Sequence, residues 1–195
     1  MVISIFTWVF AYALGSIPFG VLLARNQDVD LRKHGSKNIG ATNVARVMGK
    51  KAGALTLFGD AFKGWLGIAM ASWVSNDPFV VAGAGIMVFL GHLFSVFLKF
   101  KGGRGVATGL GVHLHIMPVA ALEAIALFVF ILWISKYVSL SSIISAIALP
   151  IFGIFFDVPF EYKCISFGIA TLIVLKHCEN IRRITAGTEP RFIKK

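Results

Sequence analysis

Long apolar stretches, separated by short polar and glycine-containing segments, run through most of the chain. A helix needs about 20 apolar residues to cross the roughly 30 Å hydrocarbon core of a bilayer. Four stretches are long enough and two others are somewhat shorter: residues 2–24, 52–74, 79–98 and 138–156, then 118–134 and 162–175. The pattern predicts an all-α, polytopic membrane protein whose shorter helices tilt or thin the bilayer locally.

Basic residues gather in three of the polar segments. Seven Lys and Arg residues lie within residues 25–51, three lie at 99–104, and six lie in the tail from residue 176 onward. Because cytoplasmic loops carry such an excess, all three segments are predicted to face the cytoplasm. The first apolar stretch has no basic residues before it and meets Arg25 at its far end. This favours an external N-terminus over a cleaved signal peptide.

Helix parity decides how residues 105–133 are divided. A single span there would place the basic tail outside, whereas two spans return it to the cytoplasm. Pro118 supplies a break, because proline lacks a backbone donor and clashes with the preceding turn. The short first element, 105–117, requires burial in protein or a wet cavity. We therefore predict about seven spans in one domain, 1–195, with the C-terminus cytoplasmic; six spans or a re-entrant loop is the alternative.

Composition supports lipid as the solvent for much of this chain. It is 57% hydrophobic and 14% charged, whereas a soluble domain is roughly 45–50% apolar and about 25% charged. The net charge of +10 is compatible with nucleic-acid binding. However, the Lys and Arg residues lie between apolar spans and do not cover a folded face. No nucleic-acid partner is therefore expected.

The first cytoplasmic loop is rich in glycine, hydroxyl, amide and basic residues between His34 and Arg46. Glycines let backbone N–H groups approach an anion, and hydroxyls with a forked arginine complete a donor set suited to phosphate. A simple turn with topology-setting charges is the alternative, but it does not require this density of small donors. The candidate anion ligands are Ser36, Asn38, Gly40, Thr42, Asn43 and Arg46.

A second donor-rich segment, KGGRGVATGLG, occupies residues 101–111. It lacks the G-x-x-x-x-G-K-[ST] spacing of a nucleotide P-loop and opens a membrane helix, so nucleotide binding is not expected. A helix N-terminus beside basic side chains still favours phosphate. Close helix packing alone would explain Gly109 and Gly111. The candidate phosphate ligands here are Lys101, Gly102, Gly103, Arg104 and Gly105.

Two further groups of residues carry possible chemistry. His177 can orient or deprotonate a hydroxyl, and Asn180 lies one helical turn further on, although an interfacial helix cap is the alternative. Asp60 and Lys63 lie three residues apart inside a predicted span, where an unpaired charge is expensive. They are expected to pair, either as a structural ion pair or with Lys63 facing the anion site. The histidines lack the spacing of a metal site, so none is predicted.

Taken together, these segments resemble the bacterial acyl-phosphate:glycerol-3-phosphate acyltransferases, the PlsY family. The resemblance covers nearly the whole chain and rests on five segments: residues 15–20 (GSIPFG), 35–46, 60–64, 92–105 and 177–183 (HCENIRR). It implies catalytic roles for Ser36, Arg46, His177 and Asn180, and a phosphate-binding loop at Gly102, Gly103 and Gly105. It also implies a structural role for Glu179. Arg104 departs from the more usual lysine, keeping the charge but changing the geometry.

The resemblance implies transfer of a fatty acyl group from acyl phosphate to glycerol 3-phosphate, giving lysophosphatidic acid and phosphate for phospholipid synthesis. No G-x-S-x-G elbow and no H-x4-D pattern is present, which favours direct transfer without an acyl-enzyme. The expected partners are both substrates and membrane lipid, without a cofactor, at the cytoplasmic face of a bacterial inner membrane. The oligomeric state is open. A transporter of phosphate or an organophosphate is the alternative function.

Overall fold

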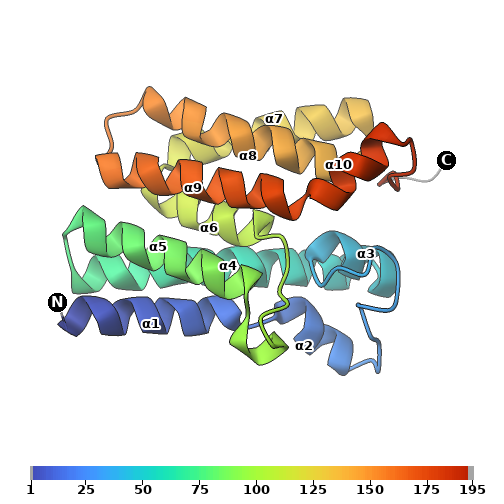
Figure 1. The fold of residues 1–195 in the computed structure, drawn as a ribbon, viewed down its shortest axis with the longest axis horizontal. Coiled ribbons are helices and arrows are strands. Elements are labelled where there is room, and N and C mark those ends of the chain that lie inside the picture. The colour runs from blue at the N-terminus through green and yellow to red at the C-terminus, as the bar shows by residue number, and fades with distance from the viewer. Residues whose placement is uncertain (1, 193–195) are drawn as a thin grey trace. The chain divides into compact units, whose positions relative to one another are not determined.

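The computed structural model describes residues 2–192 and divides into two compact units, Met1–His115 and Ile116–Lys195, each described here by itself. All regular elements of the described residues are helices, which confirms the predicted all-α class (Figure 1). The prediction that the chain acts as one functional domain stays a prediction.

Three long elements form the body of the first unit: α1 (Val2–Ser16), α4 (Lys50–Val74) and α5 (Pro78–Leu93). Helix α1 packs against both α4 and α5 (Figure 1). Glycines allow this close packing, because a Cβ added at Gly15 would overlap the backbone of Val88, and one at Gly91 would overlap the carbonyl of Tyr12. Small residues at such contacts are typical of membrane helix pairs.

The first apolar stretch is broken in the structure, although residues 2–24 were predicted as one span. Helix α1 ends at Ser16, α2 (Phe19–Arg25) begins after Ile17 and Pro18, and the two axes differ by 41°. Pro18 cannot donate the hydrogen bond that a continuous helix needs there. At the break, the carbonyl of Ile17 accepts a hydrogen bond of 2.6 Å from Lys63 Nζ.

Three short elements complete the first unit: α3 (Ala41–Met48), the 3₁₀ turn η1 (Val96–Leu98) and α6 (Val106–Ile116), whose last residue belongs to the second unit. Helix α3 packs on the start of α4. Helix α6 lies against α4, since a Cβ at Gly64 would meet the carbonyl of Thr108, and one at Gly111 would meet that of Ala61. The loops that carry the predicted anion ligands connect these short elements.

The second unit consists of four helices: α7 (Pro118–Ser135), α8 (Val138–Ile154), α9 (Phe160–Lys176) and α10 (Cys178–Thr185). Helix α8 packs against α7 and α9, and α10 contacts both α8 and α9. Helix α10 departs from α9 by 53° at His177. The tail then returns toward the start of α8, where the N–H of Phe192 donates to the carbonyl of Lys136.

Each of the seven predicted spans contains at least one helix, and the predicted break at Pro118 is present between α6 and α7. By length and apolar composition, two helical segments of the described chain suffice to cross a membrane: Pro78–Leu98 and Pro118–Ser135. The number rises to four if each bent pair, α1 with α2 and α9 with α10, counts as one span. The count of seven and the orientation of the termini therefore stay predictions.

Candidate functional site

Asn43 organises the first loop from the inside. Its side chain is buried, with the residue only 1% exposed. Its Nδ2 donates to the carbonyls of Leu31, His34 and Asn38 at 3.1, 3.2 and 2.7 Å, and its Oδ1 accepts the N–H of Ser36 at 2.7 Å. These internal contacts engage both ends of the amide. Asn43 thus maintains the loop conformation, and the substrate contact predicted for it stays a prediction.

The turn around Ser36 is tightly specified by its neighbours. Gly35 has φ +60°, and a Cβ there would overlap Asn43 Oδ1, so glycine is required for close approach as well as for conformation. Asn38 Oδ1 accepts the N–H of Gly40 at 2.8 Å, which gives this second amide a loop-forming role as well. Ser36 itself is half-buried, at the point where the loop reaches α3.

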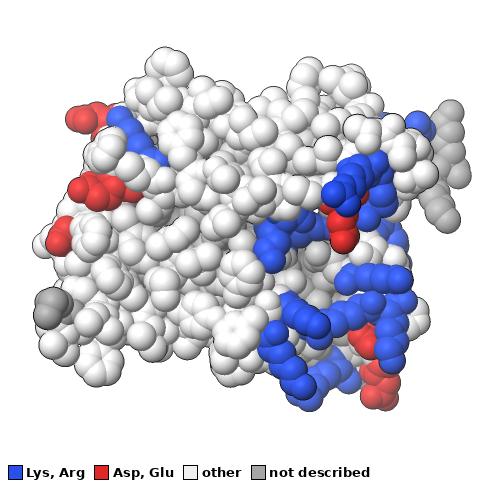
Figure 2. All heavy atoms as spheres, in the orientation of Figure 1, with Lys and Arg blue, Asp and Glu red and all other residues white. Residues whose placement is uncertain are grey.

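Helix α3 presents the remaining candidates of the first loop. Gly40 is its N-cap residue, and Thr42 and Arg46 lie four residues apart on one helical face. Thr42 is half-buried and Arg46 is exposed. The hydroxyl and the guanidinium are therefore the donors of this helix best placed for an external anion. Figure 2 shows Lys and Arg side chains gathered over the end of the first unit that holds α2 and α3.

Arg32 connects the first loop to the glycine-containing segment. Its Nη2 donates a 2.9 Å hydrogen bond to the carbonyl of Lys101. The structure thus brings together two donor-rich segments that are far apart in sequence, as a shared anion site requires. The sequence analysis did not select Arg32, because nothing in its local pattern separates it from the other basic residues of the same loop.

The N–H groups of Gly102 and Gly103 already donate to carbonyls at the end of α5. Gly102 donates to Leu93 and Gly103 to His92, each at 3.1 Å. A Cβ at Gly102 would overlap the carbonyl of His92, and one at Gly103 would overlap its imidazole. In this structure both N–H groups are engaged within the protein, and both glycines allow the loop to pack against α5. The phosphate contact predicted for Gly102 and Gly103 stays a prediction.

Gly105 and the start of α6 provide the other donors of this segment. Gly105 has φ +84°, and a Cβ there would meet the side chains of Phe89 and Leu93. Helix α6 begins directly afterward, so the N–H groups of its first turn point away from the helix without intrahelical acceptors. Arg104 is half-buried beside this helix start and Lys101 is exposed. An anion at this end of α6 would meet both charge and backbone donors.

A buried polar cluster lies behind the glycine segment. Lys63 Nζ is 2.9 Å from Asp60 Oδ1, which confirms the predicted pairing, and His92 Nδ1 lies 3.5 Å from the same oxygen. All three side chains are at most 5% exposed. Since Lys63 also donates to Ile17, the contacts favour the structural alternative for this lysine over direct anion binding. The cluster thus connects the Ile17 carbonyl at the α1–α2 break with His92, whose own carbonyl accepts the N–H of Gly103.

In the second unit, His177 sits at the bend between α9 and α10 and is 3% exposed. Its Nδ1 lies 2.8 Å from the carbonyl of Ile173, which only accepts hydrogen bonds. The neutral ring therefore carries its proton on Nδ1, so that Nε2 is the atom that can accept one.

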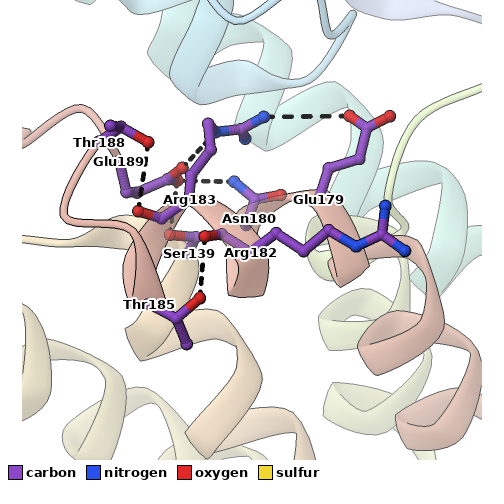
Figure 3. A network of polar contacts seen from close by, with 8 residues as sticks. All are labelled: Ser139, Glu179, Asn180, Arg182, Arg183, Thr185, Thr188 and Glu189. Atoms are coloured by element: carbon purple, nitrogen blue, oxygen red, sulfur yellow. Dashed lines mark hydrogen bonds and ion pairs between the residues drawn. The ribbon is translucent and has the colours of Figure 1, made fainter.

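Asn180 lies one turn after His177 and takes part in the network drawn in Figure 3. Its Nδ2 donates to Glu189 Oε1 at 2.6 Å, and the same oxygen accepts from Ser139 Oγ at 2.7 Å. Arg183 Nε donates to the other carboxylate oxygen at 2.7 Å. Burial by itself raises the pKa of Glu189, but hydrogen bonds from Ser139, Asn180 and Arg183, with the Arg183 charge, hold that pKa below its usual value.

Glu179, the predicted structural carboxylate, is more exposed than Glu189 and makes weaker contacts. Its side chain is 84% exposed, and its nearest ionic contact is Arg183 Nη1 at 3.9 Å. Glu189, by contrast, has a side chain only 7% exposed. The sequence analysis missed Glu189, because the chain reverses direction after α10 to reach Asn180 and no spacing rule indicates this contact.

These observations define a class of protein before any relative is considered. Two helical segments of the described chain are long and apolar enough to cross a membrane, and the hydroxyl, guanidinium, imidazole and amide groups described above lie in loops and short helices. Within residues 2–192, no group of three or more His, Cys, Asp or Glu side chains is arranged to hold a metal ion. The fold and the site thus describe a helical membrane protein whose polar side chains are suited to a phosphate-bearing substrate.

Comparison with known proteins gives the family. Residues 5–187 match the family described as glycerol-3-phosphate acyltransferase. Glycerol-3-phosphate acyltransferases from Geotalea daltonii and Geobacter sulfurreducens are each 48% identical, over 93% of this chain and 94% of theirs. The crystal structure of PlsY (YgiH), an integral membrane glycerol 3-phosphate acyltransferase, in its glycerol 3-phosphate form, matches with TM-score 0.94 and 41% identity, covering 97% of this chain and 96% of that one. Its lysophosphatidic acid form matches with TM-score 0.91 and 40% identity, covering 96% and 94%.

The chain belongs to the glycerol-3-phosphate acyltransferase family and is an integral membrane protein. The predicted resemblance is confirmed, and the transporter alternative is set aside.

Proposed function

We propose that the acyl donor of this acyltransferase is an acyl phosphate and that the acyl group passes directly to the 1-hydroxyl of glycerol 3-phosphate. The hydroxyl oxygen forms a bond to the carbonyl carbon, and the bond from that carbon to the phosphate oxygen breaks. Phosphate leaves with the electron pair, and the hydroxyl proton passes to a base. The products are lysophosphatidic acid and inorganic phosphate.

The observation that carries this proposal is the connection between two donor-rich segments in the first unit. Arg32 ties the first loop, which carries Ser36 and leads to Arg46 on α3, to Lys101 in the segment that precedes α6. Both proposed substrates carry phosphate, which such donors suit. The crystal structures of PlsY (YgiH) in its glycerol 3-phosphate and lysophosphatidic acid forms support glycerol 3-phosphate as the acceptor and lysophosphatidic acid as the product. The apolar helix surfaces suit the fatty chain.

In the first unit, Ser36 and Arg46 act on phosphate. The Ser36 hydroxyl donates a hydrogen bond, and the exposed Arg46 guanidinium neutralises charge as the leaving phosphate develops it. Thr42, one turn from Arg46, adds a second hydroxyl on the same face. Arg104, Lys101 and Gly105 contribute charge and backbone donors at the start of α6. Ser36 is not assigned as a nucleophile.

In the second unit, His177 and Asn180 act on the attacking hydroxyl. The Nδ1–H of His177 donates to the carbonyl of Ile173, so Nε2 is the basic nitrogen of the neutral ring, and we assign it to accept the hydroxyl proton. A phosphate oxygen of the substrate is an equal candidate for this base, since correct orientation alone supplies much of the acceleration. Asn180 fixes the direction of the hydroxyl. No step in this scheme uses a cofactor.

The enzyme is further proposed to work at the cytoplasmic face of a bacterial inner membrane. The basic loops of the first unit favour that side. Both the water-soluble acceptor and the released phosphate would then exchange directly with the cytoplasm, while the acyl chain stays in lipid.

The identity of the acyl donor is tested by incubating the purified protein with glycerol 3-phosphate and either palmitoyl phosphate or palmitoyl-CoA. We expect lysophosphatidic acid and equimolar phosphate with palmitoyl phosphate only. Turnover with palmitoyl-CoA alone would reject the proposed donor. Ser36→Ala should abolish most of the activity, and Ser75→Ala, at the opposite end of α4 from the first loop, is the matched control.

Direct transfer is tested by mass spectrometry of the protein after mixing with palmitoyl phosphate in the absence of acceptor. The intact mass should stay unchanged. An acyl adduct on any side chain that forms and decays at the turnover rate would require a covalent mechanism.

A further inference from the structure

We propose that Glu189 is a positioning residue that holds the Asn180 amide with its oxygen directed at the acceptor hydroxyl. The proposal rests on the function proposed above for Asn180 and adds the residue that orients it. All side chains involved lie in the second unit (Figure 3).

The first step concerns which end of the amide faces the carboxylate. An ionised carboxylate only accepts hydrogen bonds, so the Asn180 atom 2.6 Å from Glu189 Oε1 must be the nitrogen. The opposite orientation would place two oxygens against each other. Glu189 therefore determines that Oδ1 of Asn180 points away from the carboxylate.

The second step concerns the oxygen thus presented. Asn180 is 2% exposed, and its Oδ1 is buried without a hydrogen-bond partner among residues 2–192. A buried acceptor that stays unpaired destabilises a protein, so such an atom calls for a functional explanation. The hydroxyl of glycerol 3-phosphate is the kind of donor that would satisfy it.

The third step concerns the effect on the hydroxyl. When Oδ1 accepts a hydrogen bond from the hydroxyl, it fixes the direction of the O–H bond and leaves the oxygen lone pairs to attack the carbonyl carbon, while the proton itself passes to the base proposed above. A flipped amide would instead donate to that oxygen and occupy a lone pair needed for attack. Orientation of the amide therefore decides whether Asn180 assists or opposes the reaction.

Glu189 is itself held in place by several groups. Ser139 and Arg183 donate to its two oxygens, each at 2.7 Å. The N–H groups of Thr188 and Glu189 donate to the carbonyl of Arg183 at 2.8 and 3.1 Å, which closes the turn after α10. The carboxylate is thus fixed both through its side-chain partners and through its own backbone.

The test compares binding of glycerol 3-phosphate with binding of 2-hydroxypropyl phosphate, which lacks the 1-hydroxyl. Calorimetry without any acyl donor gives the ratio of the two affinities. We expect the wild type to prefer glycerol 3-phosphate by about 10- to 100-fold, as for a buried hydrogen-bonding group that otherwise stays unpaired. Glu189→Ala and Asn180→Ala should each reduce the ratio to near one, and the double variant should reduce it no further.

A purely structural role for Glu189 predicts a different pattern. Arg183→Ala is the matched control, because it weakens the same network but leaves the Glu189 to Asn180 bond. It should lower the melting temperature and keep the preference. Glu189→Asp retains a charge for Arg183 while drawing the carboxylate back from Asn180 by about the length of one carbon–carbon bond. It should lose the preference for glycerol 3-phosphate over 2-hydroxypropyl phosphate. It replaces Glu189→Ala in the test if that variant does not fold.

The outcomes separate this inference from the proposed function. No preference in the wild type, an intact preference in both folded Glu189 variants, or additive losses in the double variant would each overturn the positioning role. Because no donor is present, a failure of palmitoyl phosphate to support turnover rejects the proposed donor and leaves this test unaffected.

Discussion

Replacing Lys63 by methionine tests the buried cluster behind the glycine segment. Lys63 is 1% exposed and contacts Asp60 at 2.9 Å and the Ile17 carbonyl at 2.6 Å. Methionine is of similar length but apolar, so the change removes the charge and the hydrogen bonds with little change in packing. Asp60 is then left buried in α4 without its cation, and the carbonyl at the α1–α2 break is left without its donor.

Removing one partner of a buried ion pair costs about 3–5 kcal/mol. Protonation of the stranded Asp60 carboxylate sets an upper limit to this loss, because protonating an ordinary carboxyl group at pH 7 requires about 4 kcal/mol. A loss of about 3–4 kcal/mol corresponds to a fall in melting temperature of roughly 6–16 °C for a chain of this length. Adding Asp60→Asn removes the stranded charge, so the double variant should be more stable than Lys63→Met alone.

Tryptophan fluorescence during heating in detergent at pH 7 measures these differences. Lys51→Met is the matched control, since it makes the same substitution on an exposed residue of the same helix and should change stability by about 0.5 kcal/mol or less. If Lys63→Met melted within 2 °C of this control, or if the double variant were no more stable than the single one, the reasoning would be refuted.

Four further predictions follow from the site and the topology. Gly103→Ala places a methyl group against the His92 imidazole. In steady-state assays it should raise the Michaelis constant for glycerol 3-phosphate more than it lowers kcat. Gly168→Ala is the control, because a Cβ there meets open space, and it should change neither constant. Arg46→Ala should lower kcat by about 100-fold, measured as phosphate release. Because the pKa of Glu189 is lowered on folding, its stabilisation is complete above the ordinary value for glutamate and is lost as the pH falls through the lower folded value. The difference in melting temperature between wild type and Glu189→Gln should therefore narrow below about pH 4. A reporter fused after the last residue should be cytoplasmic and one before the first residue external; opposite labelling would discard the seven-span model.

The helices could be predicted from the sequence because the thickness of a bilayer sets their length. The break at Pro118 also followed from local chemistry, since proline ends the preceding turn. The break at Pro18 was missed. A broken helix leaves a carbonyl that lipid cannot satisfy, and the donor that makes the break tolerable is Lys63, which is 46 residues away. Such a partner is visible only in the folded chain.

The types of residue in the site could be predicted, but their individual roles could not. Glycine, amide and hydroxyl groups in the first loop indicated hydrogen bonding, yet the pattern does not say whether a donor faces a ligand or the loop itself. Asn43 bonds to three carbonyls of its own loop, and Gly102 and Gly103 donate to α5. The path of the backbone decides these partners, and that path depends on packing against α4 and α5.

The sequence also does not show which glutamate contacts the Asn180 amide, Glu179 or Glu189. Glu179 is next to Asn180 in sequence, but adjacent residues on a helix point about 100° apart and do not face each other. The reversal after α10 brings Glu189 to the Asn180 amide instead. Burial removes water as a partner, so polar groups such as Asn43 and Glu189 find their partners within the protein and serve its architecture. Asn180 departs from this rule, since the nitrogen of its buried amide is bonded and the oxygen has no partner among the described residues, 2–192. That asymmetry is the strongest structural reason to assign Asn180 to the reaction.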